Sequence, residues 1–437
     1  MTKPNILYIH SHDTGRYIQP YTGDVPAPNI QKLAEQGIIF RDCHNGAPTC
    51  SPSRGVLLTG QAAHSCGQFG LAHRGFELQE RDRHLAKFLA DNGYNTVQCG
   101  IHHVVKDPLT VGYKKRIATS PPEGRHWDCY RAEEAAAFLE QSTEEPFFLA
   151  VGFIDTHRDF PGAKGRDLDP RWCRPPVTVP DTPETRADMS EFIGSAAALD
   201  ENMGLVFDAL EKSGKAENTL VICTTDHGIA FPYMKCNCTS HGTGVMLIIK
   251  GPGGFEGGRV SNALVSHADI FPTVCELLEL DPPGWLQGVS LLPIARNETD
   301  TVREEAYAEI NFHCTYEPIR SVRTKKYLYV KRFHDRPTPM LSQIDNSPSK
   351  TIMMENGLGE AILPKEQLFD LMLDPNEVHN VAEDPAYTDV LKDMQSRLDT
   401  WMKDTDDPLL KGPILPHEGA IVNEPDDISP KDWQKRQ

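Results

Sequence analysis

The sequence predicts an α/β fold built on a central, mainly parallel sheet, followed by a smaller α+β subdomain with antiparallel strands. Up to about residue 300, short apolar runs alternate with amphipathic helical patterns. This alternation is typical of folds whose helices cover both faces of a parallel sheet. After residue 300 the runs follow one another directly, as antiparallel strands do. We therefore place one domain at residues 1–300 and a second, ending in an extended tail, at residues 301–437.

The elements of the first domain are distinguished by their period and by the residues that bound them. Short β-rich runs bounded by turn residues predict strands; they cover residues 6–9, 96–99, 147–153, 220–224 and 245–250. Amphipathic spacing, with Pro at a start or Gly at a stop, predicts helices; they cover residues 28–37, 85–92 and 189–213.

The second domain is predicted from shorter patterns. Three closely spaced runs read as antiparallel strands at residues 305–310, 319–324 and 326–333. A stretch containing Pro and Ser follows at residues 335–350, and apolar residues at helical spacing predict a terminal helix at residues 390–402. The last 25 or so residues are rich in Pro and Asp and are expected to form the extended tail.

Composition and charge restrict the classes of partner. The chain has 44 basic and 62 acidic residues, a formal net charge of −18. This acidic excess argues against nonspecific binding to nucleic acid or to an anionic membrane surface. No run of about 18 apolar residues predicts a transmembrane helix. No signal-peptide pattern precedes the first strand, so we expect a cytoplasmic protein.

The strongest local signal is the string CSPSR at residues 50–54, followed by LTG at residues 58–60. The string itself reads as a polar turn. It resembles the signature of the type I sulfatases across both halves. In that family the cysteine is converted to formylglycine, whose hydrated aldehyde attacks sulfur and then releases sulfate by collapsing to the aldehyde. The resemblance therefore implies covalent catalysis at Cys50 and a formylglycine-generating enzyme as a partner.

Two further motifs place acidic and imidazole side chains at predicted strand ends. A His–Asp pair follows the first strand, and an Asp–His pair follows the strand at residues 220–224. In the sulfatases such pairs bind one divalent cation together with the modified cysteine. The resemblance thus implies a metal site formed by His12, Asp13, Cys50, Asp226 and His227.

The donor types bear on the identity of this metal. The family usually takes calcium, sometimes magnesium or manganese, and calcium suits sites made only of oxygen ligands. Imidazole favours a transition metal. Calcium is the first expectation, and the two candidate histidine ligands bring manganese and zinc into consideration.

Four residues besides Cys50 match catalytic positions of the family. Arg54 is expected to bond the formylglycine and the metal carboxylates, and His103 to touch its diol. His157 is expected to contact the sulfate or to protonate the leaving group. Lys235 lies near the family's sulfate-binding cation, where it would stabilise negative charge; a solvated loop lysine is the alternative.

Other basic residues are candidates for holding an anionic or hydroxylated substrate. Ile101 occupies the position of a family lysine, and the adjacent His102 is a possible replacement. For each candidate the alternative is a structural role elsewhere. The candidates are His64, His102, Arg158 and Arg320, with His73, Arg74, His241 and His313 also considered.

Similarity outside the metal centre narrows the resemblance to the N-sulfoglucosamine sulfohydrolase (sulfamidase) branch. The matching segments are residues 70–75, 181–188, 229–232, 318–322 and 401–408. The implied fold is a large alkaline-phosphatase-like domain with a smaller C-terminal antiparallel sheet. The implied reaction is hydrolysis of a sulfate ester or a sulfamate. Because the acidic surface disfavours long polyanions, we expect a small sulfated sugar such as N-sulfoglucosamine.

Two other functions and the oligomeric state remain open at this point. A phosphodiesterase or phosphonate monoester hydrolase uses the same fold, formylglycine and a comparable Asp–His pair. A non-catalytic binding protein with an unmodified Cys50 is an alternative from another class, motivated by the departures at His12 and Ile101. The chain could also form an oligomer.

Overall fold

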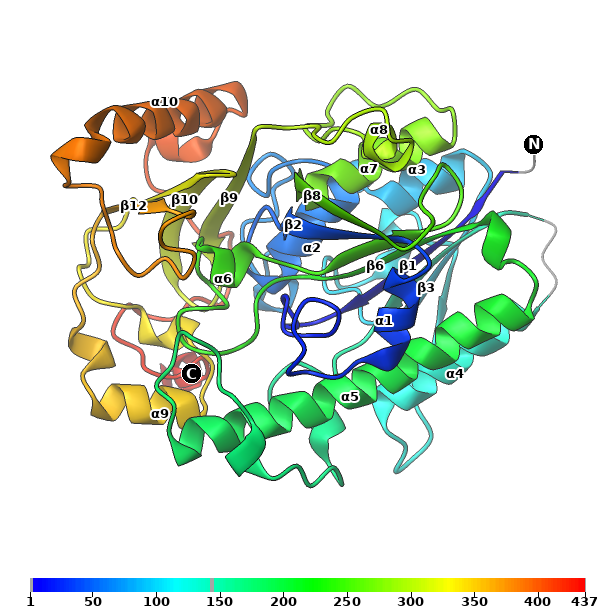
Figure 1. The fold of residues 1–437 in the computed structure, drawn as a ribbon, viewed down its shortest axis with the longest axis horizontal. Helices are drawn as coiled ribbons and strands as arrows, with labels where there is room; N and C mark the ends of the chain where they lie inside the picture. Colours follow the sequence, from blue (N-terminus) through cyan, green and yellow to red (C-terminus); the bar gives the residue numbers. More distant parts are fainter. Residues whose placement is uncertain (1–2, 142–144, 437) are drawn as a thin grey trace.

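The computed structural model describes residues 3–141 and 145–436, and within them two β-sheets separate near residue 300 (Figure 1). The strands of the first sheet run in the order β4-β3-β5-β1-β6-β7-β2-β8. Neighbouring strands are parallel except around β7, which runs antiparallel to β6 and β2. The predicted mainly parallel sheet is therefore confirmed. Its strands are β1 (Asn5–Ser11), β2 (Ile38–His44), β3 (Asn95–Gly100), β4 (Lys115–Ile117), β5 (Phe147–Gly152), β6 (Thr219–Thr225), β7 (Leu247–Lys250) and β8 (Arg259–Ser266).

Helices cover both faces of this sheet, as Figure 1 shows with α4 and α5 on one side and α3, α7 and α8 on the other. Successive side chains of a strand point to opposite faces. Leu7 and Ile9 of β1 accordingly pack in one apolar cluster, and Ile6 and Tyr8 in the other. The helices of this domain are α1 (Pro28–Ala34), α2 (Cys50–Thr59), α3 (Leu85–Asp91), α4 (Trp127–Glu140), α5 (Pro183–Lys212), α6 (Ser240–Thr243), α7 (Ile270–Leu277) and α8 (Leu292–Ala295).

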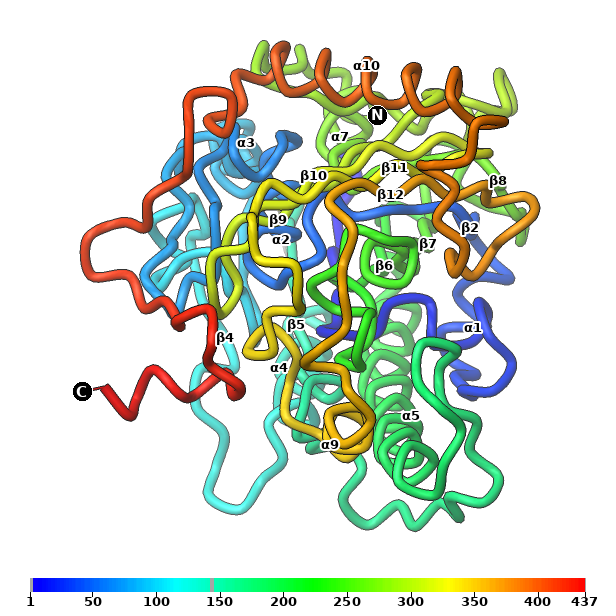
Figure 2. Tube along the Cα trace, turned by 90° about the vertical axis from the view of Figure 1, so that its left-hand side faces the viewer, coloured from blue at the N-terminus to red at the C-terminus, as the bar shows by residue number. Residues whose placement is uncertain are grey.

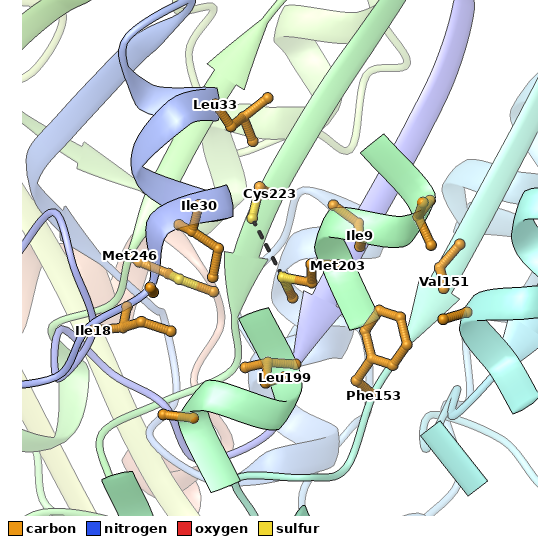
Figure 3. Close-up of a cluster of buried hydrophobic side chains, with 14 of the residues drawn as sticks. Ile9, Ile18, Ile30, Leu33, Val151, Phe153, Leu199, Met203, Cys223 and Met246 are labelled. Atoms are coloured by element: carbon orange, nitrogen blue, oxygen red, sulfur yellow. Dashed lines mark hydrogen bonds between the residues drawn. The ribbon is translucent and has the colours of Figure 1, made fainter. Parts of the chain in front are cut away.

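The long helix α5 forms much of one apolar layer. In Figure 3, Leu199 and Met203 of α5 lie near Ile9 of β1 and Ile30 of α1. The helix begins six residues earlier than predicted, because Thr182 accepts a bond from the Thr185 backbone and Pro183 occupies the first turn. This capping box starts the helix before its apolar periodicity becomes visible.

The sequence patterns missed three strands of the first sheet. β4 has only three residues, and β4 and β8 are the edge strands. β2 carries Arg41 and Asp42 in its middle, and β8 is half-exposed over its first residues. Short, polar or partly exposed strands lack the apolar run on which the prediction depended.

The second sheet has the order β12-β11-β10-β9, and its neighbouring strands are antiparallel. The predicted terminal helix is confirmed as α10, which packs Met394, Leu398 and Met402 against this sheet. The elements are β9 (Glu305–Phe312), β10 (Tyr316–Thr324), β11 (Tyr327–Arg332), α9 (Pro348–Glu355), β12 (Glu366–Asp370) and α10 (Thr388–Asp404).

The C-terminal tail lacks strands and α-helices over the described residues after Lys411, but it folds back against the body of the protein (Figure 2). Ile421 N donates to the Arg74 carbonyl at 2.9 Å, and Asn423 N donates to the Cys314 carbonyl at 2.7 Å. The tail is therefore extended, as expected, but docked. None of the helices in the described part of the chain is both long and apolar enough to span a bilayer.

Candidate active site

The register of two neighbouring strands brings two motifs together. β1 and β6 are parallel, with Ser11 opposite Thr225. The pairs that directly follow, His12-Asp13 and Asp226-His227, consequently emerge side by side at the carboxyl edge of the sheet. In open α/β sheets this edge is where ligands bind.

The side chains of the two pairs interlock. Asp226 Oδ1 accepts hydrogen bonds from the backbone N–H groups of Asp13 and His227, each at 2.9 Å. His12 Nδ1 lies 3.2 Å from Asp226 Oδ2, and His227 Nε2 lies 3.3 Å from Asp13 Oδ1. Gly228 allows this packing, because a Cβ there would stand 2.0 Å from the His241 carbonyl oxygen. The four side chains therefore converge on one small volume.

Cys50 and Arg54 reach this volume from α2. Cys50 is the first residue of the helix and is only 2% exposed, with Sγ at 3.3 Å from His227 Nε2. Arg54 follows one turn later on the same face; its Nη2 donates to Asp226 Oδ2 and to the Ser11 carbonyl, both at 3.0 Å. The expectation of a polar turn was wrong here, since the string is helical and buried.

The donor atoms fit a divalent cation. One ligand atom each from His12, Asp13, Cys50 and Asp226 lies within 4.8 Å of the others. Both ring nitrogens of His12 and Oδ1 of Asp13 are buried without a hydrogen-bond partner among the described residues. His227 Nδ1 lies 2.9 Å from the Gly228 carbonyl and donates to it, so Nε2 is the ring nitrogen that faces Asp13 and Cys50. Buried polar atoms without partners are costly, and a bound cation would remove that cost.

Two more histidines complete the rim from the neighbouring strands. β5 lies beside β1, and β3 beside β5, so residues just beyond their ends reach the same edge. The His157 ring centroid is 5.6 Å from that of His12, and the His103 centroid is 5.5 Å from it. His103 Nε2 forms a 2.8 Å hydrogen bond with Nδ1 of the exposed His73. The structure therefore brings His103 and His157 to the cluster, with His73 behind.

Backbone strain occurs at the same place. Asp13 has φ of 47° and His103 has φ of 61°, in the left-handed region that side-chain-bearing residues rarely adopt. Such conformations persist where the surrounding structure enforces them, and they gather at active sites. The positions of these two side chains are thus set by the fold rather than by local preference.

Lys235 is buried at this centre. Its Nζ lies 3.0 Å from Asp13 Oδ2 and 3.1 Å from Asp345 Oδ2. Burial opposes its charge, but the Asp13 and Asp345 carboxylates outweigh burial and raise the pKa of Lys235 above its usual range. The alternative of a solvated loop lysine is therefore wrong: the side chain is 4% exposed and cationic.

Burial and charge set the protonation of the other groups. Burial raises the pKa of the Cys50 thiol, so the unmodified side chain is a thiol rather than a reactive thiolate. Burial, with the Arg54 charge, lowers the pKa of His12 and keeps its ring neutral. Burial opposes ionisation of Asp226, but His227 and Arg54 hold its pKa at about 2. A carboxylate and a neutral imidazole are the forms that bind metal.

Arg158 and Arg320 do not lie free for a substrate. Arg158 donates to both carboxylate oxygens of Asp188, at 2.5 and 2.9 Å, and to the Ala230 carbonyl at 2.8 Å. Arg320 is fully buried and forms two hydrogen bonds to Asp407 in the second subdomain. The expectation of substrate contact is corrected for both, because their donors already serve the fold.

His64 and His102 are also held away from the centre. His64 Nδ1 lies 2.8 Å from the buried carboxylate of Glu309. The His102 ring packs against His84 and Tyr113, with centroids 5.3 and 5.4 Å apart. His64 is thus held by Glu309, and the His102 ring by its packing against two aromatic rings.

The three further candidates, Arg74, His241 and His313, differ in whether they lie near the centre. Arg74 donates to Asn423 Oδ1 at 2.9 Å and so attaches the tail. His241 lies 3.1 Å from the Asn376 carbonyl, on the loop after β12. His313 is buried where the charges of Lys235 and Asp345 act on it, and burial lowers its pKa. Of the three, only His313 borders the centre.

Sequence reasoning missed Asp345. It lies 110 positions after Lys235, within the Pro- and Ser-containing stretch that gave no motif. Only the packing of the second subdomain against the first brings it to Lys235.

Comparison with known proteins agrees with this geometry. The family profile described as Sulfatase matches residues 4–280, and a profile described as N-sulphoglucosamine sulphohydrolase, C-terminal, matches residues 235–357. Human N-sulphoglucosamine sulphohydrolase is 27% identical over 465 residues, covering 94% of this chain and 92% of its own. An ulvan-active sulfatase of Formosa agariphila is 25% identical, covering 92% of this chain and 75% of its own.

Solved structures share the fold. A 2-O GAG sulfatase superposes with a TM-score of 0.75 at 21% identity, covering 94% of each chain. The phosphonate monoester hydrolase of Agrobacterium radiobacter superposes with a TM-score of 0.71 at 20% identity, covering 97% of this chain and all of its own. With more than half of its length matched by the profile, the chain belongs to the sulfatase family and is a sulfuric ester hydrolase.

Proposed function

We propose that this sulfatase removes sulfate from a small sulfated sugar, as an O-sulfate ester or as the N-sulfate of a compound such as N-sulfoglucosamine. One observation carries the proposal: Cys50 of the family signature lies 3.3 Å from His227, inside a buried set of metal-type ligands. The resemblance to human N-sulphoglucosamine sulphohydrolase over 94% of the chain supports the sulfamate branch. The ulvan-active relatives support sulfated sugars more broadly.

The proposed reaction needs two groups that the twenty standard side chains do not supply: a metal ion and a modified cysteine. Asp13, Asp226 and His227, with His12 as a further ligand, would hold a divalent cation, which would stabilise negative charge on the sulfate group. Formylglycine at position 50, as its hydrate, supplies an oxygen nucleophile in place of a thiol that burial keeps protonated. The mixed oxygen and imidazole set makes manganese and zinc candidates beside calcium.

The protein's own cations face the anionic substrate. Arg54 is bonded to Asp226 and so orients that carboxylate. Lys235 carries a buried positive charge against Asp13, where it can stabilise the sulfate group. The negative charge of the substrate would therefore be balanced by the side chains of Arg54 and Lys235, although the whole chain has a net charge of −18.

We assign the leaving-group proton to His157. Its Nδ1 bonds with the Arg158 carbonyl, which leaves Nε2 free on a side chain that is 29% exposed. Nε2 lies 4.0 Å from Asp13 Oδ2, between the buried centre and solvent. A protonated Nε2 there would serve as the general acid for a poor leaving group.

A phosphonate monoester hydrolase is the second candidate within the enzymes. It is favoured by the Asp226-His227 pair and by the fold shared with the Agrobacterium radiobacter protein. The discriminating experiment compares the turnover of 4-nitrophenyl sulfate, N-sulfoglucosamine and an aryl phosphonate monoester by one preparation. We expect both sulfated compounds to be hydrolysed faster than the phosphonate. Cleavage of the phosphonate alone would refute the sulfatase substrate.

The non-catalytic alternative depends on the state of Cys50. Mass spectrometry of the peptide that contains Cys50, from protein co-produced with a formylglycine-generating enzyme, measures the conversion directly. We expect the aldehyde. An unmodified thiol together with no turnover would favour a binding protein instead.

A further inference from the structure

Lys235 is held by two carboxylates that come from different parts of the fold. Asp13 follows β1 of the large sheet, whereas Asp345 lies just before α9. The two carboxylate oxygens lie 3.0 and 3.1 Å from the same ammonium nitrogen. The side chain of Lys235 is 4% exposed, so the pairs are shielded from solvent. Asp345 thus joins the second subdomain to the ammonium group of Lys235.

The loop that carries Asp345 is fixed by a second buried lysine. Lys350 is 4% exposed, and its Nζ donates to the carbonyl oxygens of Leu341 and Ile344, each at 2.8 Å. It also donates to Asn346 Oδ1 at 3.3 Å. Asp345 lies between two of these acceptors. The lysine therefore closes the loop around itself and leaves little freedom to the Asp345 backbone.

The C-terminal tail adds to this arrangement. Lys350 Nζ makes a fourth contact, 2.6 Å from the Ile428 carbonyl oxygen, and Asn346 Nδ2 donates to Ser429 Oγ at 2.8 Å. Contacts thus run from the tail through Lys350 and the loop to Asp345, and from there to Lys235. The docked tail has a structural connection to the catalytic centre.

The number of carboxylates around a lysine determines how freely its ammonium group moves and with which group it pairs. With Asp13 alone, Nζ would pair fully with that residue, and the same carboxylate is a candidate metal ligand. A second carboxylate, with an oxygen 3.1 Å from Nζ, shares the ammonium with Asp13 and restricts its position. Preorganised charge of this kind is what stabilises a transition state without reorganisation.

We propose that Asp345 is a positioning residue for Lys235. By pairing with the ammonium group, it weakens the pairing between Lys235 and Asp13. The ammonium group then stays available to the substrate anion, and the Asp13 carboxylate stays available to the metal ion. This rests on the proposed function, in that Lys235 is taken to bind the sulfate group. Asp345 itself acts through Lys235 and does not perform a chemical step. Its carboxylate, 17% exposed, is the most accessible of the three charged groups.

A double-mutant cycle tests this relation. Asp345→Ala is made alone and in a Lys235→Ala background, and kcat and KM are measured for 4-nitrophenyl sulfate. We expect Asp345→Ala to lower kcat about tenfold in the native background and less than about twofold in the other. Asp345→Asn keeps an oxygen acceptor without the charge and should fall between. Equal losses in both backgrounds would overturn the proposal, because Asp345 would then act independently of Lys235.

Titration with Mn²⁺ alone provides a readout that does not need turnover. Without Asp345, Lys235 pairs more closely with Asp13, so Mn²⁺ affinity should fall about threefold or more. In the Lys235→Ala background the same change should leave Mn²⁺ affinity unaltered. Unchanged affinity in the native background, or equal weakening in both, would contradict the proposal.

The matched control is Asp335→Ala, which removes a carboxylate–lysine pair of the same subdomain that is exposed at the surface. It should change neither kcat nor Mn²⁺ affinity. The two readouts also separate this proposal from the proposed function. Coupling in the Mn²⁺ titration without any sulfate turnover would refute the substrate and keep the positioning role. Sulfate turnover in which the losses from Asp345→Ala and Lys235→Ala simply add would keep the proposed function and refute the positioning role.

Discussion

Two buried clusters of charged side chains differ in how completely their hydrogen bonds are satisfied. In the second subdomain, Arg320 uses all five of its N–H donors. Nε and Nη2 donate to Asp407 at 2.6 and 3.0 Å, and Nη2 also donates to Asn311 Oδ1 at 2.9 Å. Nη1 donates to the carbonyls of Ile310 and Ile319 at 3.0 and 2.9 Å. This arginine has no donor left for a ligand.

The catalytic centre is equally buried but incomplete. Both ring nitrogens of His12, Oδ1 of Asp13 and Nε of Arg54 lack hydrogen-bond partners within the described parts of the chain. A polar group left unpaired inside a protein destabilises the fold. The comparison teaches that burial and charge are shared by both clusters, whereas the unpaired atoms on His12 and Asp13 leave bonds that a cation can make.

Replacing the reactive side chain gives the largest expected effect. Cys50→Ala should lower turnover of an aryl sulfate by about three orders of magnitude or more, because no other side chain supplies the nucleophile. The thermal unfolding midpoint should stay near that of the parent protein, since only one sulfur is removed. The control is Cys129→Ala at an exposed cysteine, which should keep full activity. Retained activity in the Cys50 variant would show that the mechanism is wrong.

A substitution in the fully hydrogen-bonded Arg320 cluster should lower the stability of the fold rather than the activity. Arg320→Met leaves the Asp407 carboxylate buried without its cation and removes one of the partners of Glu309. We expect the free energy of unfolding to fall by about 3–5 kcal/mol, measured by urea denaturation, with kcat/KM per folded molecule unchanged. Arg397→Met removes a half-exposed arginine pair and should cost less than about 1 kcal/mol. A similar small loss at Arg320 would contradict the comparison.

The incomplete cluster should instead respond to loss of a ligand. His227→Ala removes an imidazole next to Asp13 and Cys50. Metal affinity should fall about tenfold or more, measured as bound metal per chain after dialysis against calcium, manganese or zinc. The exposed His379→Ala variant is the control. Unaltered metal content in the His227 variant would remove this residue from the ligand set.

A pH dependence of stability tests a buried carboxyl group outside both clusters, that of Asp155. Burial and the neighbouring Asp128 raise the pKa of Asp155 to about 8, from a usual value of 3.8. Between these values the folded chain keeps a proton that the unfolded chain has released, so this group's contribution to stability falls as the pH rises. Asp155→Asn removes that proton equilibrium while keeping an amide that can bond as the protonated acid does.

The free energy of unfolding of the Asp155→Asn variant, relative to the parent, should therefore rise by about 1 kcal/mol per pH unit between pH 5 and pH 8. Urea denaturation at each pH measures this difference. Asp300→Asn, at an exposed carboxylate, should give no slope. A flat difference for Asp155 would show that its carboxyl ionises normally in the folded chain.

Much of the site followed from the sequence because its motifs are local to strand ends. Asp13 and Asp226 could be placed together once the strands were predicted, since parallel strands share a carboxyl edge. The buried helix that carries Cys50 was not recognised, because residues 50–54 contain Ser and Pro and lack apolar periodicity. Edge strand β4 was missed for a similar reason, as three residues give no period.

Residues with alternative partners could not be assigned from the sequence. Arg158 and Arg320 carry the same charge as Lys235, yet their donors are taken by Asp188 and by Asp407. Asp345 gave no signal at all, because its role depends on a lysine 110 positions away. Which cation meets which carboxylate is a property of long-range packing.

The sequence by itself determined the α/β architecture, the family signature around Cys50 and the acid–imidazole pairs at the strand ends. These features are encoded locally, in periodicity and in short motifs. Only the tertiary structure decided which buried charged groups have all their hydrogen bonds. It also decided that Lys235 pairs with Asp345 of the second subdomain as well as with Asp13. The physical reason is that a charge is neutralised by whatever lies within a few ångströms, and the chain's long-range contacts determine what lies there.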